Sequence, residues 1–240
     1  MTERFYRSWS KSSGLVSFKA AVAETDLFIS AGRDLTLEAI KAIKEARLDI
    51  EEYIRAHPYF KETLEPVPLD KAAPQIVKQM IDAGLKALVG PMAAVAGAVA
   101  EAVGRKLLGM TKEIIVENGG DIYINSKSAR KIGIYAGPSP LSNKVGIEIK
   151  SEDTPCGVCT SSATVGPSLS FGRTDATVIY SRNCALADAA ATAVGNIVQT
   201  KDEINDGLNL AKGIKGVEGA LIIIKDAMGA WGKIKIVDIT

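Results

Sequence analysis

The sequence predicts a single α+β domain spanning residues 1–240, in which mixed or antiparallel sheets pack against alanine-rich helices. Three observations lead to this prediction. A chain of 240 residues can bury about 70–75% of its unfolded surface, so it needs no disulfide or metal for stability. Predicted strands and helices are mixed without strict β-α-β alternation. No Gly-x-Gly-x-x-Gly follows a predicted strand, which argues against a doubly wound dinucleotide fold.

Short apolar runs and turn residues give the expected order of elements. A hairpin is expected over 15–21 and 27–30, and a helix from Thr36 as N-cap to His57, where Pro58 disfavours further helix. The apolar positions Leu37, Ile40, Ile43, Ile50 and Ile54 share one face of that helix. Further helices are expected over 74–83, stopped by Gly84, around Gly97, and over 185–195 and 201–211. The remaining strands are expected at 113–116, 122–124, 131–135, 145–149, 157–161, 176–180, 217–224 and 233–239, the last two around a turn at 229–232.

Composition excludes several classes of function. The 29 basic and 28 acidic residues nearly balance, so no electrostatic argument favours nucleic acid or an anionic membrane as a partner. The charged N-terminus lacks the apolar segment of a secretory signal, and no apolar run is long and uninterrupted enough to span a membrane. Three cysteines do not suggest a disulfide framework, and a cytoplasmic location is expected.

Residues 185–195 are almost entirely helix formers, interrupted by Asp188 and Thr192. These two lie four residues apart and therefore on one helix face, where they form a hard oxygen pair suited to Mg²⁺. Alternatively, Asp188 complements the dipole of its own first turn while Thr192 bonds back to a carbonyl. Residues 94–104 match this stretch at alternate alanines and at a closing Ala-Val-Gly, with Gly97 opposite Asp188. The match suggests two related halves, about 1–110 and 111–240, each with a helix ending at a glycine.

Asn118, Gly119, Gly120 and Asp121 lie between two apolar runs. Asn-Gly between strands is typical of a two-residue hairpin turn. Two glycines followed by an aspartate also let backbone N–H groups approach a pyrophosphate or flavin edge, with Asp121 available to a hydroxyl or metal. Both interpretations remain open from the sequence.

The segment 156–172 combines thiols and hydroxyls. Cys156 and Cys159 form a Cys-x-x-C pair, but a single remote histidine and no second pair make a zinc site a weak interpretation. Small buried core residues are the alternative, while Cys159 is singled out because Thr160, Ser161 and Ser162 follow it. The stretch 160–172 is rich in hydroxyls and glycine, as in phosphate-binding loops and in plain connectors.

Asn-Gly-Gly-Asp-Ile at 118–122, Thr-Ser-Ser at 160–162 and Ala-Asp-Ala-Ala-Ala-Thr-Ala at 187–193 together resemble the ApbE superfamily, and more closely its uncharacterised branch in archaea and anaerobic bacteria. The best-known members are Mg²⁺-dependent enzymes that transfer FMN from FAD to protein threonines. The resemblance implies Asp188 and Thr192 as Mg²⁺ ligands, Asp188 also as a catalytic residue, and Asn118 to Asp121 with Thr160 to Ser162 around FAD or FMN. It also implies that the helix around Gly97 supplies a backbone carbonyl to the metal at the same site.

The sequence departs from the family pattern at two places. The family's His-Ile-Ile-Asp-Pro stretch corresponds to Pro-Ser-Leu-Ser-Phe at 167–171, without a histidine, and its Ala-Lys-Gly helix start has become Val95-Ala96-Gly97. The charge that would stabilise a leaving phosphate is therefore reduced. Binding of a flavin or related nucleotide is expected, with a Mg²⁺-dependent flavin-nucleotide transferase or hydrolase activity as the enzymatic possibility.

Two other functions remain open. The first is a thiol-dependent accessory protein in anaerobic sulfur assimilation, with Cys159, alone or together with Cys156, as a sulfur carrier. The Cys-x-x-C pair suggests it, and the resembled branch tends to accompany sulfur metabolism. Buried, unreactive cysteines would count against it. The second is a non-catalytic scaffold whose alanine-rich helices form a subunit interface in a homodimer.

Overall fold

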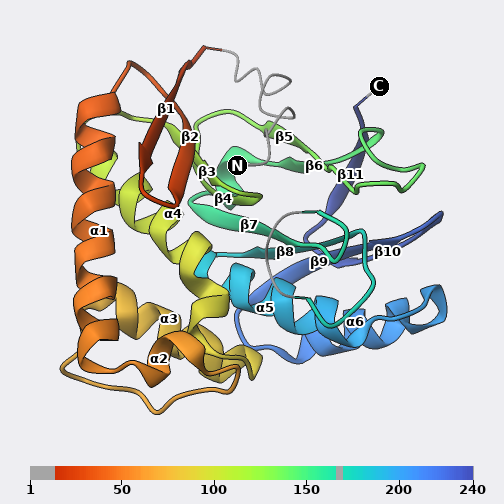
Figure 1. Cartoon of the computed structure of the whole chain (residues 1–240). Coiled ribbons are helices and arrows are strands. Elements are labelled where there is room, and N and C mark those ends of the chain that lie inside the picture. Colours follow the sequence, from red (N-terminus) through yellow and green to blue (C-terminus); the bar gives the residue numbers. More distant parts are fainter. Residues whose placement is uncertain (1–13, 166–169, 240) are drawn as a thin grey trace.

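The computed structural model describes residues 14–165 and 170–239. Eight strands form one antiparallel sheet in the order β1-β2-β3-β4-β7-β8-β9-β10, and three more form a small sheet in the order β11-β6-β5 (Figure 1). The strands are β1 Val16–Val22, β2 Thr25–Ala31, β3 Ile114–Asn118, β4 Asp121–Asn125, β5 Arg130–Gly133, β6 Val145–Ile149, β7 Cys156–Ser161, β8 Ala176–Ser181, β9 Val217–Ile224, β10 Ala227–Gly232 and β11 Lys235–Asp238.

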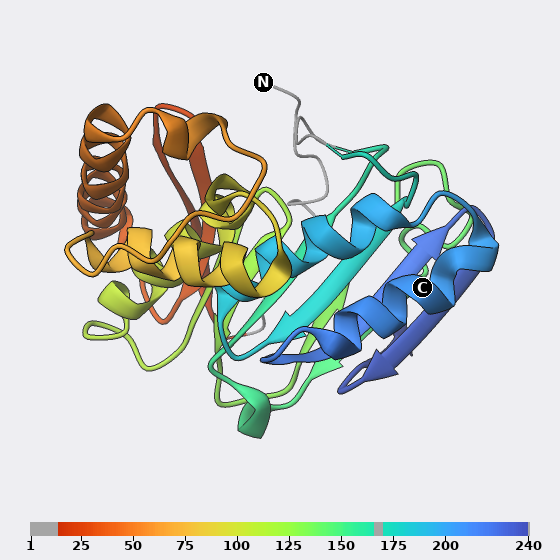
Figure 2. The ribbon, with the colours of Figure 1, turned by 90° about the horizontal axis from the view of Figure 1, so that it is seen from below.

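The helices cover one face of the large sheet and the small sheet covers the other (Figures 1 and 2). They are α1 Thr36–Ala56, α2 Tyr59–Glu62, α3 Gln75–Ala87, α4 Val95–Leu107, α5 Cys184–Ile197 and α6 Ile204–Gly213, with short 3₁₀ turns η2 Pro91–Ala94, η3 Ser151–Asp153 and η4 Lys201–Glu203. The centre of the large sheet is therefore buried on both faces. Along β8, for example, Val178 packs between the sheets and Ile179 packs under the helices.

The α+β class and nearly all predicted elements are confirmed, but the glycines were misread as helix ends. Helix α3 continues through Gly84, and Gly104 and Gly195 lie inside α4 and α5. A Cβ on Gly104 would lie 2.3 Å from the Tyr123 ring, and one on Gly84 would lie 2.7 Å from the Val89 carbonyl oxygen. These glycines thus permit close packing within helices, a role that competes with helix termination.

Three further predictions need correction. Thr36 is the first residue of α1, and Asp34 Oδ1 accepts hydrogen bonds from both its N–H (2.8 Å) and its hydroxyl (2.6 Å). Leu37 is 80% exposed, because the buried stripe of α1 consists mainly of alanines. The predicted turn at 229–232 lies within β10, and the hairpin turn before β10 is formed by Lys225 and Asp226.

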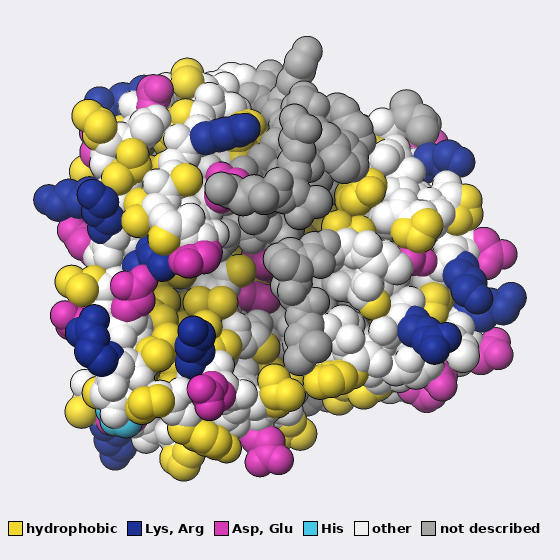
Figure 3. All heavy atoms as spheres, viewed as in Figure 1, with side chains coloured by type: hydrophobic (Ala, Val, Ile, Leu, Met, Phe, Trp, Pro, Cys, Tyr) yellow, Lys and Arg dark blue, Asp and Glu magenta, His cyan; other side chains and the backbone are white. Residues whose placement is uncertain are grey.

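The surface shown in Figure 3 carries both signs of charge, as the balanced composition predicts. Basic and acidic side chains are interspersed over the face shown in Figure 3. Among the described residues, no single helix has the length and apolarity needed to cross a membrane. Helix α3 and the segment Pro91–Leu107 reach that level only as a pair, bent by 107° at the break between them.

Candidate functional site

The carboxylate of Asp188 on α5 lies at the N-terminus of α4. The Gly97 N–H donates a hydrogen bond of 2.8 Å to Asp188 Oδ2. Gly97 is the third residue of α4, and the first N–H groups of a helix have no acceptor within the helix. Asp188 therefore complements the N-terminus of a different helix rather than the first turn of its own, which is capped by the Asn183 side chain at the Leu186 N–H (2.7 Å).

The two helices meet so closely that Gly97 has no room for a side chain. A Cβ built there would lie 2.4 Å from the Cys184 carbonyl oxygen and 2.9 Å from Asp188 Cβ. The alanine-rich composition of both helices permits this approach, as the sequence indicated. Gly97 thus contributes its backbone N–H to the Asp188 contact, whereas the resemblance implied a backbone carbonyl from this helix.

Glu101 is a further residue of the site, and no role for it was predicted from the sequence. The residue is 3% exposed, and its Oε2 accepts a 2.7 Å hydrogen bond from the Cys184 N–H at the start of α5. Arg105 pairs with the other oxygen at 2.7 Å. A lone carboxylate within a run of small apolar residues was the available signal, because a buried charge requires such partners.

The Gly119–Gly120 turn connects β3 to β4 beside the same helix end. Its glycines have φ of +69° and +111°, and Asn118 pairs with Asp121 across the two-residue hairpin. The Asn118 side-chain amide donates to the Ala96 carbonyl at 3.0 Å, which ties the turn to the first residues of α4. A two-residue hairpin turn is present, but one residue later than the predicted Asn118-Gly119, and it lies next to the Asp188 contact.

Asp121 brings a second carboxyl group toward Asp188. It is 7% exposed and points to the helix side of the sheet, as Tyr123 does two residues later on β4. Burial, together with the nearby charge of Asp121, raises the pKa of the Asp188 carboxyl well above its usual range. A cation held at this position would offset both the burial of the Asp188 carboxylate and its repulsion by Asp121.

Thr192 follows Asp188 by one turn on α5 and is half-buried. Asp121, Asp188 and Thr192 offer only hard oxygen donors, the chemistry that Mg²⁺ prefers. Within the described parts of the chain, no group of three or more His, Cys, Asp or Glu side chains is arranged to hold a metal ion. Any Mg²⁺ here would therefore need hydroxyl, backbone, water or ligand oxygens beside the two carboxylates.

The hydroxyls of Thr160, Ser161 and Ser162 diverge. Thr160 lies beside the glycine turn, since a Cβ on Gly120 would be 3.7 Å from the Thr160 carbonyl oxygen. Ser161 faces α5, where its Oγ would lie 3.7 Å from a Cβ on Gly195. Ser162 Oγ instead accepts hydrogen bonds from the N–H groups of residues 164 and 165, at 3.1 and 3.0 Å, and so shapes its own turn.

The Cys-x-x-C pair does not form one site. Cys156 packs between the two sheets, whereas Cys159 points to the helices, where its Sγ lies 3.6 Å from that of Cys184. Burial raises the pKa of Cys159 well above its usual value and raises that of Cys156 to about 12. Thiols so buried and so weakly acidic supply little thiolate near neutral pH, which counts against a reactive Cys159.

Part of the predicted phosphate-facing segment, residues 166–169, lies outside the described residues. From residue 170 the chain crosses the C-terminal end of α5. There the Phe171 N–H donates to Asn196 Oδ1 at 2.9 Å. Val95, Ala96 and Gly97 form the first turn of α4, as the resemblance implied.

Comparisons with known proteins show the family of this chain. A family model described as AbpE bacteria matches residues 7–214. A UPF0280 protein of Methanosarcina acetivorans is 44% identical over 214 residues, which cover 88% of this chain and 84% of that protein. A UPF0280 protein of Methanocaldococcus jannaschii is 46% identical over 202 residues, 82% of each chain.

Solved structures share the fold at low sequence identity. The flavin transferase ApbE from Vibrio cholerae superimposes with a TM-score of 0.61 at 13% identity, covering 91% of this chain and 96% of that one. The flavinyl transferase ApbE from Pseudomonas stutzeri gives a TM-score of 0.54 at 14% identity, with 91% and 94% covered. The fold and the family match together show that this chain belongs to the ApbE-like family, in the branch that contains the archaeal UPF0280 proteins.

Proposed function

We propose that this chain binds a flavin nucleotide, FAD or FMN, together with Mg²⁺, where α4, α5 and the Gly119–Gly120 turn meet. The contact between Asp188 and Gly97 supports this most directly. With the Asn118 bond to Ala96, it brings together three segments that are remote in sequence and that carry the family motifs.

The residues present fit a divalent cation bound to a phosphate. The Asp121 charge disfavours ionisation of the neighbouring Asp188, and a cation between them would relieve this repulsion. With the Thr192 hydroxyl one turn away, these oxygens favour a small hard cation. In the proposal Asp188 and Thr192 hold Mg²⁺, which when bound would neutralise charge on the phosphates of the nucleotide. Because Gly119 and Gly120 have no side chains, the backbone of the turn can approach the nucleotide closely.

Binding is proposed as the main activity, with transfer or hydrolysis secondary. The solved neighbours are described as flavin transferases, and their similarity supports a flavin ligand. The sequence at 167–171 has no histidine where the family carries one, so a proton-transferring side chain is lacking there. A cytoplasmic location and a homodimer, both expected from the sequence, belong to the same proposal.

Isothermal titration of the full chain tests the proposal. FAD, FMN and ATP are each added with and without Mg²⁺, to the wild type, to Asp188→Ala and to Asp82→Ala. Asp82 is a suitable control because its carboxylate lies on the surface of α3, paired with Lys86. We expect Mg²⁺-dependent binding of FAD or FMN that Asp188→Ala weakens at least about tenfold and Asp82→Ala leaves unchanged.

Absence of binding by all three nucleotides would refute the proposal and favour the scaffold hypothesis. Equal affinities of wild type and Asp188→Ala would indicate that the nucleotide binds elsewhere on the molecule. The visible absorbance spectrum of the purified chain is an independent readout, because a flavin carried from the cell is coloured.

A further inference from the structure

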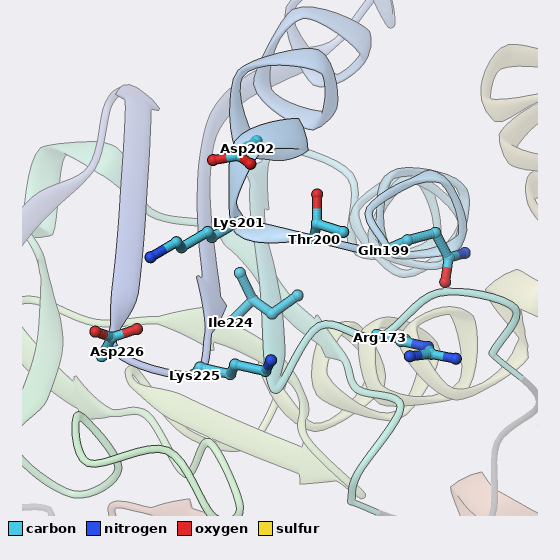
Figure 4. A pocket seen from close by; sticks show the side chains of 8 residues that line it. All are labelled: Arg173, Gln199, Thr200, Lys201, Asp202, Ile224, Lys225 and Asp226. Atoms are coloured by element: carbon cyan, nitrogen blue, oxygen red, sulfur yellow. The ribbon is translucent and has the colours of Figure 1, made fainter.

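We propose that the chain has a second ligand site, a pocket of about 350 Å³ that binds a small phosphate monoester (Figure 4). The pocket lies between the end of α5, the start of η4 and the β9–β10 turn. Its volume is in the range of small-molecule sites. The end of α5 lies about 13 Å along the helix from Asp188, so this site is separate from the flavin site proposed above.

Three cationic side chains from three separate segments line the pocket. They are Arg173 before β8, Lys201 in η4 and Lys225 in the β9–β10 turn. None of them has a carboxylate within ion-pair distance among the described residues. Three cations without ion-pair partners line one concave surface, and two of them, Arg173 and Lys225, lie at the same end of it, where an oxyanion would be favoured.

Lys225 is held in a backbone conformation that disfavours its side chain. Its φ is +54°, in the left-handed region where glycine or asparagine is usual for a two-residue hairpin. Two buried groups fix this conformation: the Lys225 N–H donates to Asp175 Oδ2 at 2.6 Å, and Ser139 Oγ donates to the Lys225 carbonyl at 2.5 Å. A lysine placed at such cost and so firmly held suggests a functional side chain.

Close packing of the chain also fixes the position of Arg173. A Cβ on the preceding Gly172 would lie 1.8 Å from the Gly195 carbonyl oxygen, so only glycine lets this segment lie on the end of α5. The Arg173 N–H donates to the Val198 carbonyl at 2.9 Å. The guanidinium therefore extends from an anchored backbone.

The pocket has two chemically different ends. In Figure 4 the Lys225 side chain points toward Arg173, whereas Lys201 points to the other end, where Asp202 and Asp226 lie. The first end suits a phosphate group, and the carboxylates at the other end suit hydroxyl donors. A phosphate ester of a hydroxyl-rich small molecule, such as a sugar phosphate, satisfies both ends.

Titration of the full chain with ribose 5-phosphate and with inorganic phosphate tests the proposal. We expect saturable binding of ribose 5-phosphate that Lys225→Gly and Arg173→Gln each weaken at least about tenfold. Inorganic phosphate should bind more weakly, and Asp226→Asn should reduce that difference. Because Lys225→Gly relieves the left-handed strain, it should raise Tm by about 2–4 °C while it weakens binding.

Three control variants make the outcome decisive. Ala23→Gly relieves the same strain (φ +50°) in the two-residue turn of the β1–β2 hairpin, so it should raise Tm without affecting binding. Lys215→Gln removes an exposed charge elsewhere and should also leave binding unchanged. Asp188→Asn should leave ribose 5-phosphate binding intact, which separates this site from the flavin proposal.

Several outcomes would overturn the inference. No saturable binding to the wild type is one. Equal weakening by Lys215→Gln and Lys225→Gly is another, because it would indicate an adventitious ion only, attracted by net charge. Binding lost in Asp188→Asn but kept in Lys225→Gly would assign the phosphate to the flavin site.

Discussion

Asp188 and Gly97 occupy equivalent positions in two similar helical segments, and they touch each other through a 2.8 Å hydrogen bond. Glu101 follows Gly97 by four residues on α4, and it contacts Cys184, which precedes Asp188 by four residues on α5. The helices therefore pass each other in opposite directions, and each supplies a carboxylate to the N-terminus of the other. Contact between equivalent residues is expected where a twofold axis relates two halves, so the two-halves hypothesis stays a prediction with this support.

Gly97→Ala should destabilise the chain and weaken flavin binding. The added methyl would lie 2.4 Å from the Cys184 carbonyl oxygen, so α4 and α5 must separate. Overpacking of this kind costs about 1–3 kcal/mol, measurable as a lower urea midpoint. Gly213→Ala is the matched control, because a Cβ there meets nothing within 4 Å, and it should leave stability equal or slightly higher. Equal effects of the two variants would contradict the close crossing.

Glu101→Ala should destabilise the chain more than removal of a surface acid. The substitution leaves the Cys184 N–H without its buried acceptor and Arg105 without its partner, which costs about 1–3 kcal/mol. Asp82→Ala, which breaks the exposed pair with Lys86, should cost at most about 1 kcal/mol. Glu101→Gln should lie between these values, because an amide oxygen can still accept the hydrogen bond. Urea denaturation of the three variants measures the order.

The stability of the ligand-free chain should fall as pH rises through the Asp188 titration. Burial and the Asp121 charge raise the folded-state pKa of Asp188 well above 3.8, so the native state binds this proton more tightly than the unfolded state. Its contribution is therefore full below about pH 4 and is lost as pH rises through the raised folded-state pKa. Asp188→Asn should remove that loss, as seen by urea denaturation from pH 4 to pH 8. Identical pH slopes of wild type and variant would contradict the assignment.

Added Mg²⁺ should restore the stability that is lost when Asp188 ionises, and only in the wild type. A cation bound beside Asp121 and Asp188 stabilises the charged carboxylates, so Tm at pH 7 should rise with Mg²⁺ concentration. In Asp188→Asn the rise should be reduced or absent. An equal rise in both proteins would indicate that Mg²⁺ binds elsewhere.

All three cysteines should resist alkylation in the native protein. Cys156, Cys159 and Cys184 are buried, and burial raises the pKa of the Cys156 thiol to about 12. Iodoacetamide at pH 8, followed by mass spectrometry, should label them only after unfolding in urea. Rapid native labelling of Cys159 would instead revive the thiol-dependent alternative.

The sequence by itself determined the α+β class, nearly every strand and the two alanine-rich helices, because these depend on local propensity and on alternation of apolar residues. It also predicted a two-residue hairpin turn, but at Asn118-Gly119, whereas the structure has it one residue later, at Gly119 and Gly120, where positive φ values favour glycine. The family motifs identified the segments that carry the candidate site.

The tertiary structure decided which partner each of these groups has. Asp188 accepts a hydrogen bond from the N-terminus of α4, and Glu101 accepts one from the N-terminus of α5. Cys159 lies beside Cys184 rather than with Cys156. Local spacing misread Gly84, Gly104 and Gly195 as helix ends because a glycine that ends a helix and one that admits a neighbouring chain look the same in sequence. Only the packing of remote segments distinguishes them, since close approach depends on atoms that are distant along the chain.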